Sequence, residues 1–392
     1  MNIISNNKSK QLYCRWLGVY FICLILGAMN IGPIGSLLRI LALIPVAIWA
    51  LEKHTFPAKD IEVKTLLFVG WCILSTIWSI QMDASIDRSI TQITFGVLIL
   101  SAGAYDYDKS EIEYLKSCLV WSSRVAAVLV LISADYLSGR LYLHSFVQED
   151  PNYLCGYFMF AISSCLSILL QGEKGKNKAL AILELVVYMY IIFATGSRGG
   201  MLAVIICAGV IILFTNSGKG YVGKNIIRRG VVVIVMIVGY FIVVNRIDSN
   251  IINRYTYVAI SQSNGTGRFA LWQDALNAFM ESNFFRKLVG YGTASARSVT
   301  YAFNFHEHNV LHNIYLEYLV ELGSIGALIY ISHIASFFKK AIRAKDLYSI
   351  SILSGMVVLS MSTSIYAFKP YWNIMLFILC TRNLVERTAE DI

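Results

Sequence analysis

The segment LHNIYLEYLVELGSIGALIYISHI (residues 311–334) joins a polar loop to a long apolar run and defines the kind of protein this is. The run is long enough to cross the ~30 Å hydrocarbon layer of a bilayer as a helix. His312 stands at its beginning, and imidazole is the side chain whose ordinary pKa suits proton transfer near neutral pH. We therefore predict a membrane-spanning helix with a proton- or ligand-handling group at its mouth.

The composition of the whole chain agrees with a membrane protein. Of 392 residues, 57% are hydrophobic and 15% are charged, whereas soluble proteins have about 25% charged residues. The net charge of +9 could indicate a nucleic-acid partner. The cations, however, gather in short loops between apolar runs, as the positive-inside rule requires, and we predict no nucleic-acid partner.

The hydropathy pattern predicts an all-α, polytopic integral membrane protein with about twelve transmembrane helices. We take the chain, 1–392, as a single membrane domain. The interruption of the last apolar stretch by Lys369-Pro370 makes the boundary between the final two spans the hardest to place. The predicted spans are 14–30, 33–51, 64–80, 89–104, 116–133, 152–170, 179–195, 200–214, 230–245, 311–334, 347–364 and 368–384.

Charge indicates which ends of these spans are cytoplasmic. Most of the Lys and Arg residues fall in alternate loops, most sharply in 171–178 and 339–346, which predicts that both termini are inside. Lys8, Lys10 and Arg15 precede the first apolar run without a clean cleavage site after it, and we expect an uncleaved first span. The eight cysteines lie in or beside apolar runs without a CxxC motif, which favours simple packing.

Two connections on the predicted outer side are longer than a turn needs. Residues 134–151 end in Asp150-Pro151-Asn152-Tyr153, and residues 246–310 form an extracytoplasmic loop between the ninth and tenth predicted spans. Long loops of this kind tend to carry function. Within the second loop, Thr266 is an expected N-cap. It precedes a predicted short amphipathic helix at the outer membrane face, marked by Phe269, Trp272, Ala275, Leu276 and Phe279.

Two arginines fall on this outer face beside glycines. Arg198 lies in TGSRGG (195–200), where free backbone N–H groups can form an anion-binding nest. Arg268 follows Gly265-Thr266-Gly267 at the predicted start of the loop helix, where orphan N–H groups also favour an anion. The planar guanidinium suits phosphate. A snorkelling or solvated arginine is the simpler alternative at both positions.

Histidines at 308 and 312 form the third feature. At helical spacing i, i+4 they could share a metal, with His306, Glu307 or Glu317 as a third ligand. His306-Glu307 begins like the zinc-protease motif HExxH, but Val310 occupies the second histidine position. We favour His312 as a base or ligand-binding group over a metal ligand, and we leave the role of His308 open. Asp106-Tyr107-Asp108 matches the DxD of metal-dependent sugar-nucleotide enzymes, but its place in a charged inner loop favours a solvated turn.

These motifs, in this order, resemble those of the O-antigen ligase and O-antigen polymerase superfamily. The resemblance runs from TGSRGG through GRFALW (267–272) to His312-Asn313 with Gly323 and Gly326, and DPNY (150–153) resembles a stretch common in polymerase-type members. It implies a GT-C-like, inverting and metal-independent glycosyltransferase without a cofactor, in the bacterial inner membrane with its site facing the periplasm. The donor it implies is a glycan on undecaprenyl diphosphate.

The resemblance also implies roles for the candidate site residues. Arg198 and Arg268 match the family's arginines and would hold the diphosphate, while His312 matches its histidine and would take the proton from the acceptor hydroxyl. The acceptor would be another lipid-linked repeat in a polymerase or the lipid A core in a ligase, and DPNY favours the polymerase.

A transporter of an anionic substrate is a different class of function. It would need charges inside several spans, and only Arg39 and Arg124 lie clearly inside one. These two arginines could instead pair locally or snorkel.

Overall fold

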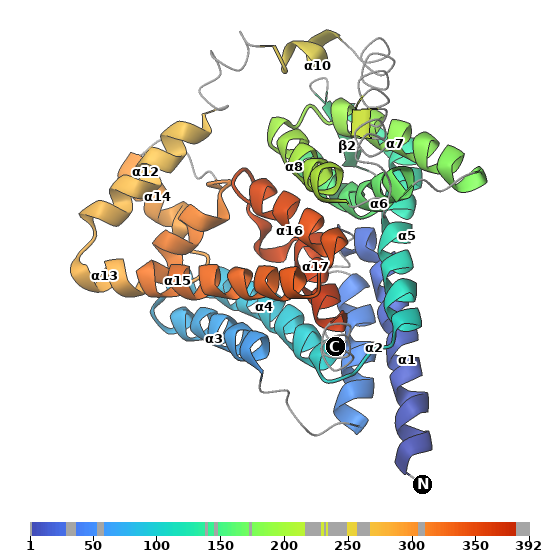
Figure 1. The fold of residues 1–392 in the computed structure, drawn as a ribbon. Helices are drawn as coiled ribbons and strands as arrows, with labels where there is room; N and C mark the ends of the chain where they lie inside the picture. Colours follow the sequence, from blue (N-terminus) through green and yellow to red (C-terminus); the bar gives the residue numbers. More distant parts are fainter. Residues whose placement is uncertain are drawn as a thin grey trace.

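The computed structural model describes residues 2–28, 37–52, 59–137, 140–144, 148–171, 175–215, 229–230, 233, 249–256, 267–304 and 310–381. Helices dominate these residues (Figure 1). The first half contains α1 (Asn2–Ile22), η1 (Leu24–Ala28), α2 (Leu37–Glu52), α3 (Asp60–Ser75), η3 (Thr76–Trp78), α4 (Met82–Gly103), α5 (Lys109–Ser133), α6 (Pro151–Gln171) and α7 (Lys176–Ala194). The second half contains α8 (Arg198–Phe214), α10 (Ser249–Asn253), α12 (Arg268–Glu281), α13 (Phe284–Val289), α14 (Ala296–Asn304), α15 (Ile314–Arg343), α16 (Leu347–Leu359), η4 (Ile365–Ala367) and α17 (Lys369–Cys380).

Every predicted span apart from 230–245 coincides with one of these helices, and nearly all of 230–245 lies outside the described residues. Among the described residues, five helices are long and apolar enough to cross a bilayer: Asp60–Trp78, Lys109–Ser133, Pro151–Gln171, Lys176–Ala194 and Ile314–Arg343. Arg198–Phe214 and Leu347–Leu359 are shorter apolar helices. At 1.5 Å per residue, a helix of 13 residues such as α16 covers only about 20 Å. The structure thus supports an α-helical membrane protein, and the number twelve stays a prediction.

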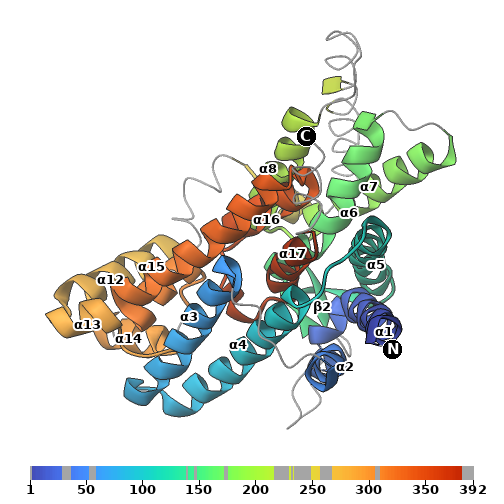
Figure 2. The same cartoon turned by 60° about the horizontal axis from the view of Figure 1, so that its bottom comes forward.

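The last two predicted spans form separate helices, α16 and α17, and α17 begins at the Lys369-Pro370 interruption. Pro370 occupies the first turn of α17, the one helical position where a missing N–H costs nothing. Every residue from Pro370 to Cys380 is buried, and α17 packs against α4, α5, α6, α15 and α16. In two views it lies in the middle of the molecule (Figures 1 and 2). It is therefore the central helix of the fold.

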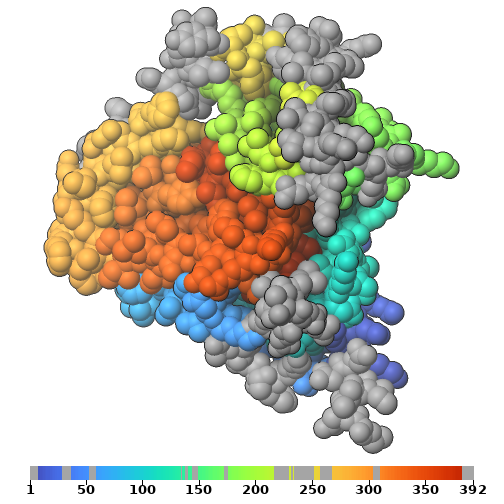
Figure 3. Space-filling model, in the orientation of Figure 1, coloured from blue at the N-terminus to red at the C-terminus, as the bar shows by residue number. Residues whose placement is uncertain are grey.

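Two groups of helices surround α17. On one side α8 packs between α6 and α16, and α6 also contacts α5 and α7. On the other side α15 packs against α3, α12 and α13. The space-filling view shows α12–α14 forming the flank next to α15 (Figure 3).

The loop 134–151 departs from the all-α prediction. It forms a small antiparallel sheet in the order β1 (Ala134–Leu137), β2 (Arg140–His144), β3 (Gln148–Glu149), with Leu137 opposite Arg140. Leu141 and Leu143 are buried, and between them Tyr142 faces the other way, which is the period of two expected of a strand. The sheet contacts α5, α6 and α7 and places Arg140 at the turn between α7 and α8.

The loop 246–310 contains α10, α12, α13 and α14. A helix, α12, is present where the amphipathic helix was predicted, and its place at the outer membrane face stays a prediction. Two details differ. Its N-cap is Gly267, with φ 79°, and Thr266 lies outside the described residues. Its buried face carries Ala275 and Ala278, because small side chains let α12 approach its neighbours, whereas Phe269 is 58% exposed and Leu276 39% exposed.

Smaller features of the sequence also find an explanation. All eight cysteines are unpaired, and all except the half-buried Cys23 are buried, as packing predicts. Arg124 pairs with Glu184 at 3.0 Å between α5 and α7, so this charge inside a helix pair is satisfied locally. In the DxD stretch, Asp108 Oδ1 accepts the backbone N–H of Glu111 at 2.9 Å and so caps α5.

Candidate functional site

The TGSRGG turn connects α7 to α8 and contains the residue that begins α8, Arg198. Gly196 has φ +60°, a left-handed conformation that glycine adopts without strain, and it ends α7. Ser197 then caps α8, its Oγ accepting the N–H of Gly200 at 3.0 Å. A Cβ on Gly200 would overlap the Cys155 side chain of α6. Arg198 therefore occupies the first position of α8, where the helix N-terminus also favours an anion.

The DPNY stretch ties this turn to the small sheet. Asp150 Oδ1 accepts the backbone N–H and the side-chain Nδ2–H of Asn152, at 2.7 and 2.6 Å. Asn152 Oδ1 in turn accepts from Ser197 Oγ at 2.8 Å and from Arg140 Nη2 at 3.3 Å. The stretch was predicted only as a family signature, and the structure shows that it fixes the geometry of the arginine-bearing turn.

Four arginines from separate elements converge here. Arg140 Nε donates to the carbonyl of Thr195 at 2.9 Å, and Arg254 Nε donates to that of Gly196 at 3.3 Å. The charges of Arg140, Arg198 and Arg254 all act on Arg268. Two predicted residues, Arg198 and Arg268, thus belong to one cluster with two others that the prediction missed.

The electrostatics of the cluster are strongly positive. Burial lowers the pKa of Arg268; Asp150 opposes this, and the other three arginines lower the pKa further. Burial likewise lowers the pKa of Arg254, followed by the charges of Arg140 and Arg198. The like charges gathered around Asp150 repel one another. A polyanion such as a diphosphate would relieve this repulsion.

His312 lies beside the arginine cluster at the start of α15. It has φ +51°, an uncommon conformation for a residue other than glycine. The backbone on both sides of it is fixed: Trp272 Nε1 donates to the carbonyl of Leu311 at 2.9 Å, and Asn313 caps α15 by accepting from Tyr315 N and Leu316 N at 3.1 and 3.2 Å. The loop helix α12 and the helix α15 therefore hold His312 from two directions.

The charge state of His312 follows from this environment. Burial lowers its pKa first, the positive charge of Arg268 lowers it further, and Asp150 partly opposes both. The ring is half-buried, and no described residue forms a hydrogen bond with it. This environment favours the neutral imidazole, which is the form that can accept a proton.

Gly323 of the GSIG stretch shapes α15 behind His312. Gly323 has φ 69° and ψ −175°, so the helix is interrupted there. The interruption frees carbonyls from helical pairing: those of Val320 and Glu321 accept from Tyr291 N and Gly292 N at 3.1 and 2.8 Å, and that of Leu322 accepts from Trp71 Nε1 at 3.1 Å. The kink thus seats the segment between α13 and α14 against α15.

Other candidates are not brought into this site. Gly265, Thr266, His306, Glu307 and His308 lie outside the described residues, so a His308/His312 metal pair stays untested. Glu317, the third proposed ligand, points into a separate cavity. Of the residues outside the predicted set, Arg140 and Asp150 lie in the outer loop 134–151, and Arg254 lies in the outer loop 246–310 with Arg268. An inventory of charges on the predicted outer face would have found them.

The comparison with known protein families agrees with this geometry. Residues 183–331 match the O-antigen ligase family, and this segment includes the TGSRGG turn, Arg268, His312, Gly323 and Gly326. The family resemblance predicted from the motifs is therefore confirmed. The chain is a multi-pass membrane protein whose residues 183–331 are similar to the O-antigen ligase family.

Two individual proteins are similar over most of the chain. A protein of Rickettsia conorii (strain ATCC VR-613 / Malish 7), provisionally named a polysaccharide ligase, is 22% identical over 305 residues, covering 74% of this chain and 70% of the relative. A chain from the solved structure of a peptidoglycan synthase complex matches with a TM-score of 0.46 and 15% identity, covering 84% of this chain and 99% of that one.

Proposed function

We propose that this protein is an inverting glycosyltransferase that transfers a glycan from undecaprenyl diphosphate to the hydroxyl of an acceptor sugar outside the cytoplasmic membrane. The observation that supports this most is the convergence of Arg140, Arg198, Arg254 and Arg268 beside His312, whose pKa is lowered by burial and by Arg268. A lipid-linked diphosphate is a polyanion that presents itself at a membrane boundary. The family match adds the class of substrate.

In this proposal the arginines bind the diphosphate and the histidine activates the acceptor. His312 removes the proton from the acceptor hydroxyl, whose oxygen forms a bond to the anomeric carbon of the donor sugar. The bond from that carbon to the diphosphate oxygen breaks, and the electron pair leaves with the diphosphate. Attack from the opposite face inverts the anomeric centre. The arginines stabilise the charge that grows on the leaving group in the transition state, and a general base must lie within hydrogen-bond reach of the hydroxyl.

Of the two acceptors, we favour another lipid-linked repeat, which makes the enzyme a surface-polysaccharide polymerase. The DPNY stretch supports this choice, because it resembles a stretch common in polymerase-type members. The ligase, which transfers the glycan to lipid A core, is the alternative, and the name of the Rickettsia relative favours it.

Glycan analysis of a deletion strain separates the two acceptors. Loss of a polymerase leaves lipid A core that carries a single repeat. Loss of a ligase leaves bare core while lipid-linked polymer accumulates. A deletion strain with unchanged surface glycan would contradict both forms of the proposal.

A further inference from the structure

A polar cavity of about 800 Å³ lies next to the site but outside the arginine cluster. Residues of α2, α4, α14, α15, η4 and α17 line it. The volume of the cavity is typical of sites for small organic ligands. Its charged lining is unusual for such sites, because they are mostly apolar. Val310 and Leu311 also line it, and Leu311 directly precedes His312. The cavity thus extends to the residue that directly precedes the proposed base.

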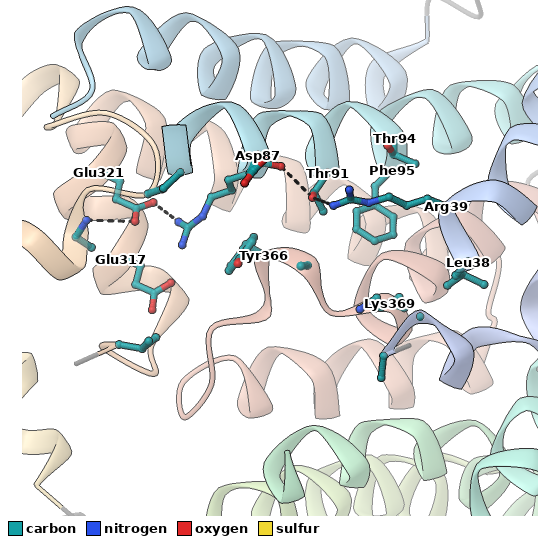
Figure 4. Close-up of a pocket in the computed structure, with 18 of the residues that line it drawn as sticks. Leu38, Arg39, Asp87, Thr91, Thr94, Phe95, Glu317, Glu321, Tyr366 and Lys369 are labelled. Carbon is teal, nitrogen blue, oxygen red and sulfur yellow. Dashed lines mark hydrogen bonds and ion pairs between the residues drawn. The ribbon is translucent and has the colours of Figure 1, made fainter. Parts of the chain in front are cut away.

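One end of the cavity carries two carboxylates (Figure 4). Glu321 forms an ion pair with Arg88 and accepts the N–H of Ala296 at 3.3 Å, so its charge is compensated. Glu317 is only 2% exposed, and one of its oxygens accepts from Ser364 Oγ. Its other oxygen, Oε2, has no hydrogen-bond partner among the described residues. A buried acceptor without a donor costs free energy, so this atom points to a ligand that donates, such as a sugar hydroxyl.

The opposite end of the cavity carries Arg39 and Lys369 (Figure 4). Arg39 Nη2 donates to Thr91 Oγ1 at 2.7 Å, which uses one of the five donors of a guanidinium. Lys369 forms no hydrogen bond or ion pair through its ammonium with a described residue; the charges that act on it are those of Glu149 and Arg39. Arg39 lies inside a predicted span and Lys369 at the start of another, where cations are expensive and mark functional sites. Among the described residues no carboxylate is paired with either of these neighbouring cations, which favours an anionic ligand.

We propose that this cavity is the acceptor subsite and that its occupant is a second lipid-linked diphosphate. Arg39 and Lys369 bind the diphosphate, and Glu317 accepts a hydrogen bond from a hydroxyl of the acceptor sugar. The orientation fits the chemistry: a short lipid-linked repeat has its reactive hydroxyl at one end and its diphosphate at the other. The proposal rests on the proposed function and deepens it, because two diphosphate sites are needed by a polymerase and not by a ligase.

Counting diphosphate sites tests this proposal. The full-length protein in lipid nanodiscs is titrated with radiolabelled undecaprenyl diphosphate, and we expect two sites per chain. The double variant Arg39→Ala/Lys369→Ala should lose one site, its affinity falling roughly tenfold to a hundredfold or more for each charged contact removed. The charge-keeping variant Arg39→Lys/Lys369→Arg should keep most of that affinity. A matched control replaces the exposed Arg15 and Lys178 by Ala and should keep both sites.

The outcomes separate this proposal from the proposed function. Loss of one site in Arg39→Ala/Lys369→Ala and of the other in Arg198→Ala/Arg268→Ala supports both. A wild-type protein with one site, removed only by Arg198→Ala/Arg268→Ala, overturns the acceptor subsite and leaves the proposed function intact. One site removed only by Arg39→Ala/Lys369→Ala overturns the proposed arginine cluster instead. Competition with inorganic phosphate and inorganic diphosphate gives a further outcome. If phosphate displaces the second lipid as effectively as diphosphate does, the site binds anions in general, and the acceptor subsite is overturned.

Discussion

Replacing Gly323 by Ala tests the kink that holds the site together. Gly323 combines φ 69° with ψ −175°, a backbone region that is open almost only to glycine and costs another residue roughly 1–3 kcal/mol. An added Cβ would also lie 2.6 Å from Gly290 N and would overlap the carbonyl of Leu288, and both obstacles are backbone. Overpacking of this kind costs about 1–3 kcal/mol. Together the two effects should lower the free energy of unfolding by roughly 2–6 kcal/mol.

Gly209→Ala is the matched control for this prediction. Gly209 lies within α8, has ordinary helical φ, and nothing lies within 4 Å of its ideal Cβ. Alanine there should be neutral or slightly stabilising, since it has the higher helix propensity. Thermal unfolding of both variants in the same detergent should give a Tm for Gly323→Ala that is lower by about 5 °C or more. If the two variants unfold within about a degree of each other, the kink does not constrain α15 as argued.

The remaining predictions concern the arginines, the topology and the pH dependence. Arg198→Ala and Arg268→Ala should each lower activity about tenfold to a hundredfold, because each removes a charge-assisted contact worth roughly 1.5–3 kcal/mol. Lys at either position should restore activity only in part. Full activity of the Ala variants at normal protein levels would exclude these arginines from the site. A cysteine at Ser261 should react with an impermeant thiol reagent outside spheroplasts and one at Ser217 should not; the reverse pattern would invert the topology. Because the pKa of His312 is lowered, kcat/KM should decrease only when the pH falls below the ordinary histidine pKa of about 6.5. Arg268→Gln removes a positive charge beside His312 and should shift this decrease to higher pH. An acidic limb above that value in the wild type would contradict the assigned environment.

Much of the helical architecture could be predicted from hydropathy, because a bilayer imposes one length and one polarity on every spanning helix. The Lys369-Pro370 boundary shows the limit. Proline at that position can kink one helix or begin another, and only the packing of α17 at the centre decides this. The small sheet at 134–149 was missed because its strands are short and the surrounding apolar pattern is helical.

The candidate site was predictable in part. Arg198, Arg268 and His312 carry local signals: glycines beside a charge, and a histidine at the mouth of a span. Arg140 and Arg254 carry none, because their role depends on hydrogen bonds to the carbonyls of a turn far away in the sequence. Arg39 was recognised as a charge inside a span, but its neighbour Lys369 comes from the other end of the chain. Their juxtaposition is a property of the fold alone.

The most direct test of the mechanism compares His312→Ala with His308→Ala in purified, reconstituted protein. Both the rate of glycan transfer and the affinity for the lipid-linked donor are measured for each variant. Loss of the base should slow transfer by about 10²–10⁴-fold in His312→Ala. Donor affinity should stay close to the wild-type value because the arginines bind the diphosphate, and His308→Ala should be milder. Near-normal turnover in His312→Ala, or an inactive His308→Ala beside an active His312→Ala, would show that the base has been misassigned and would contradict this mechanism.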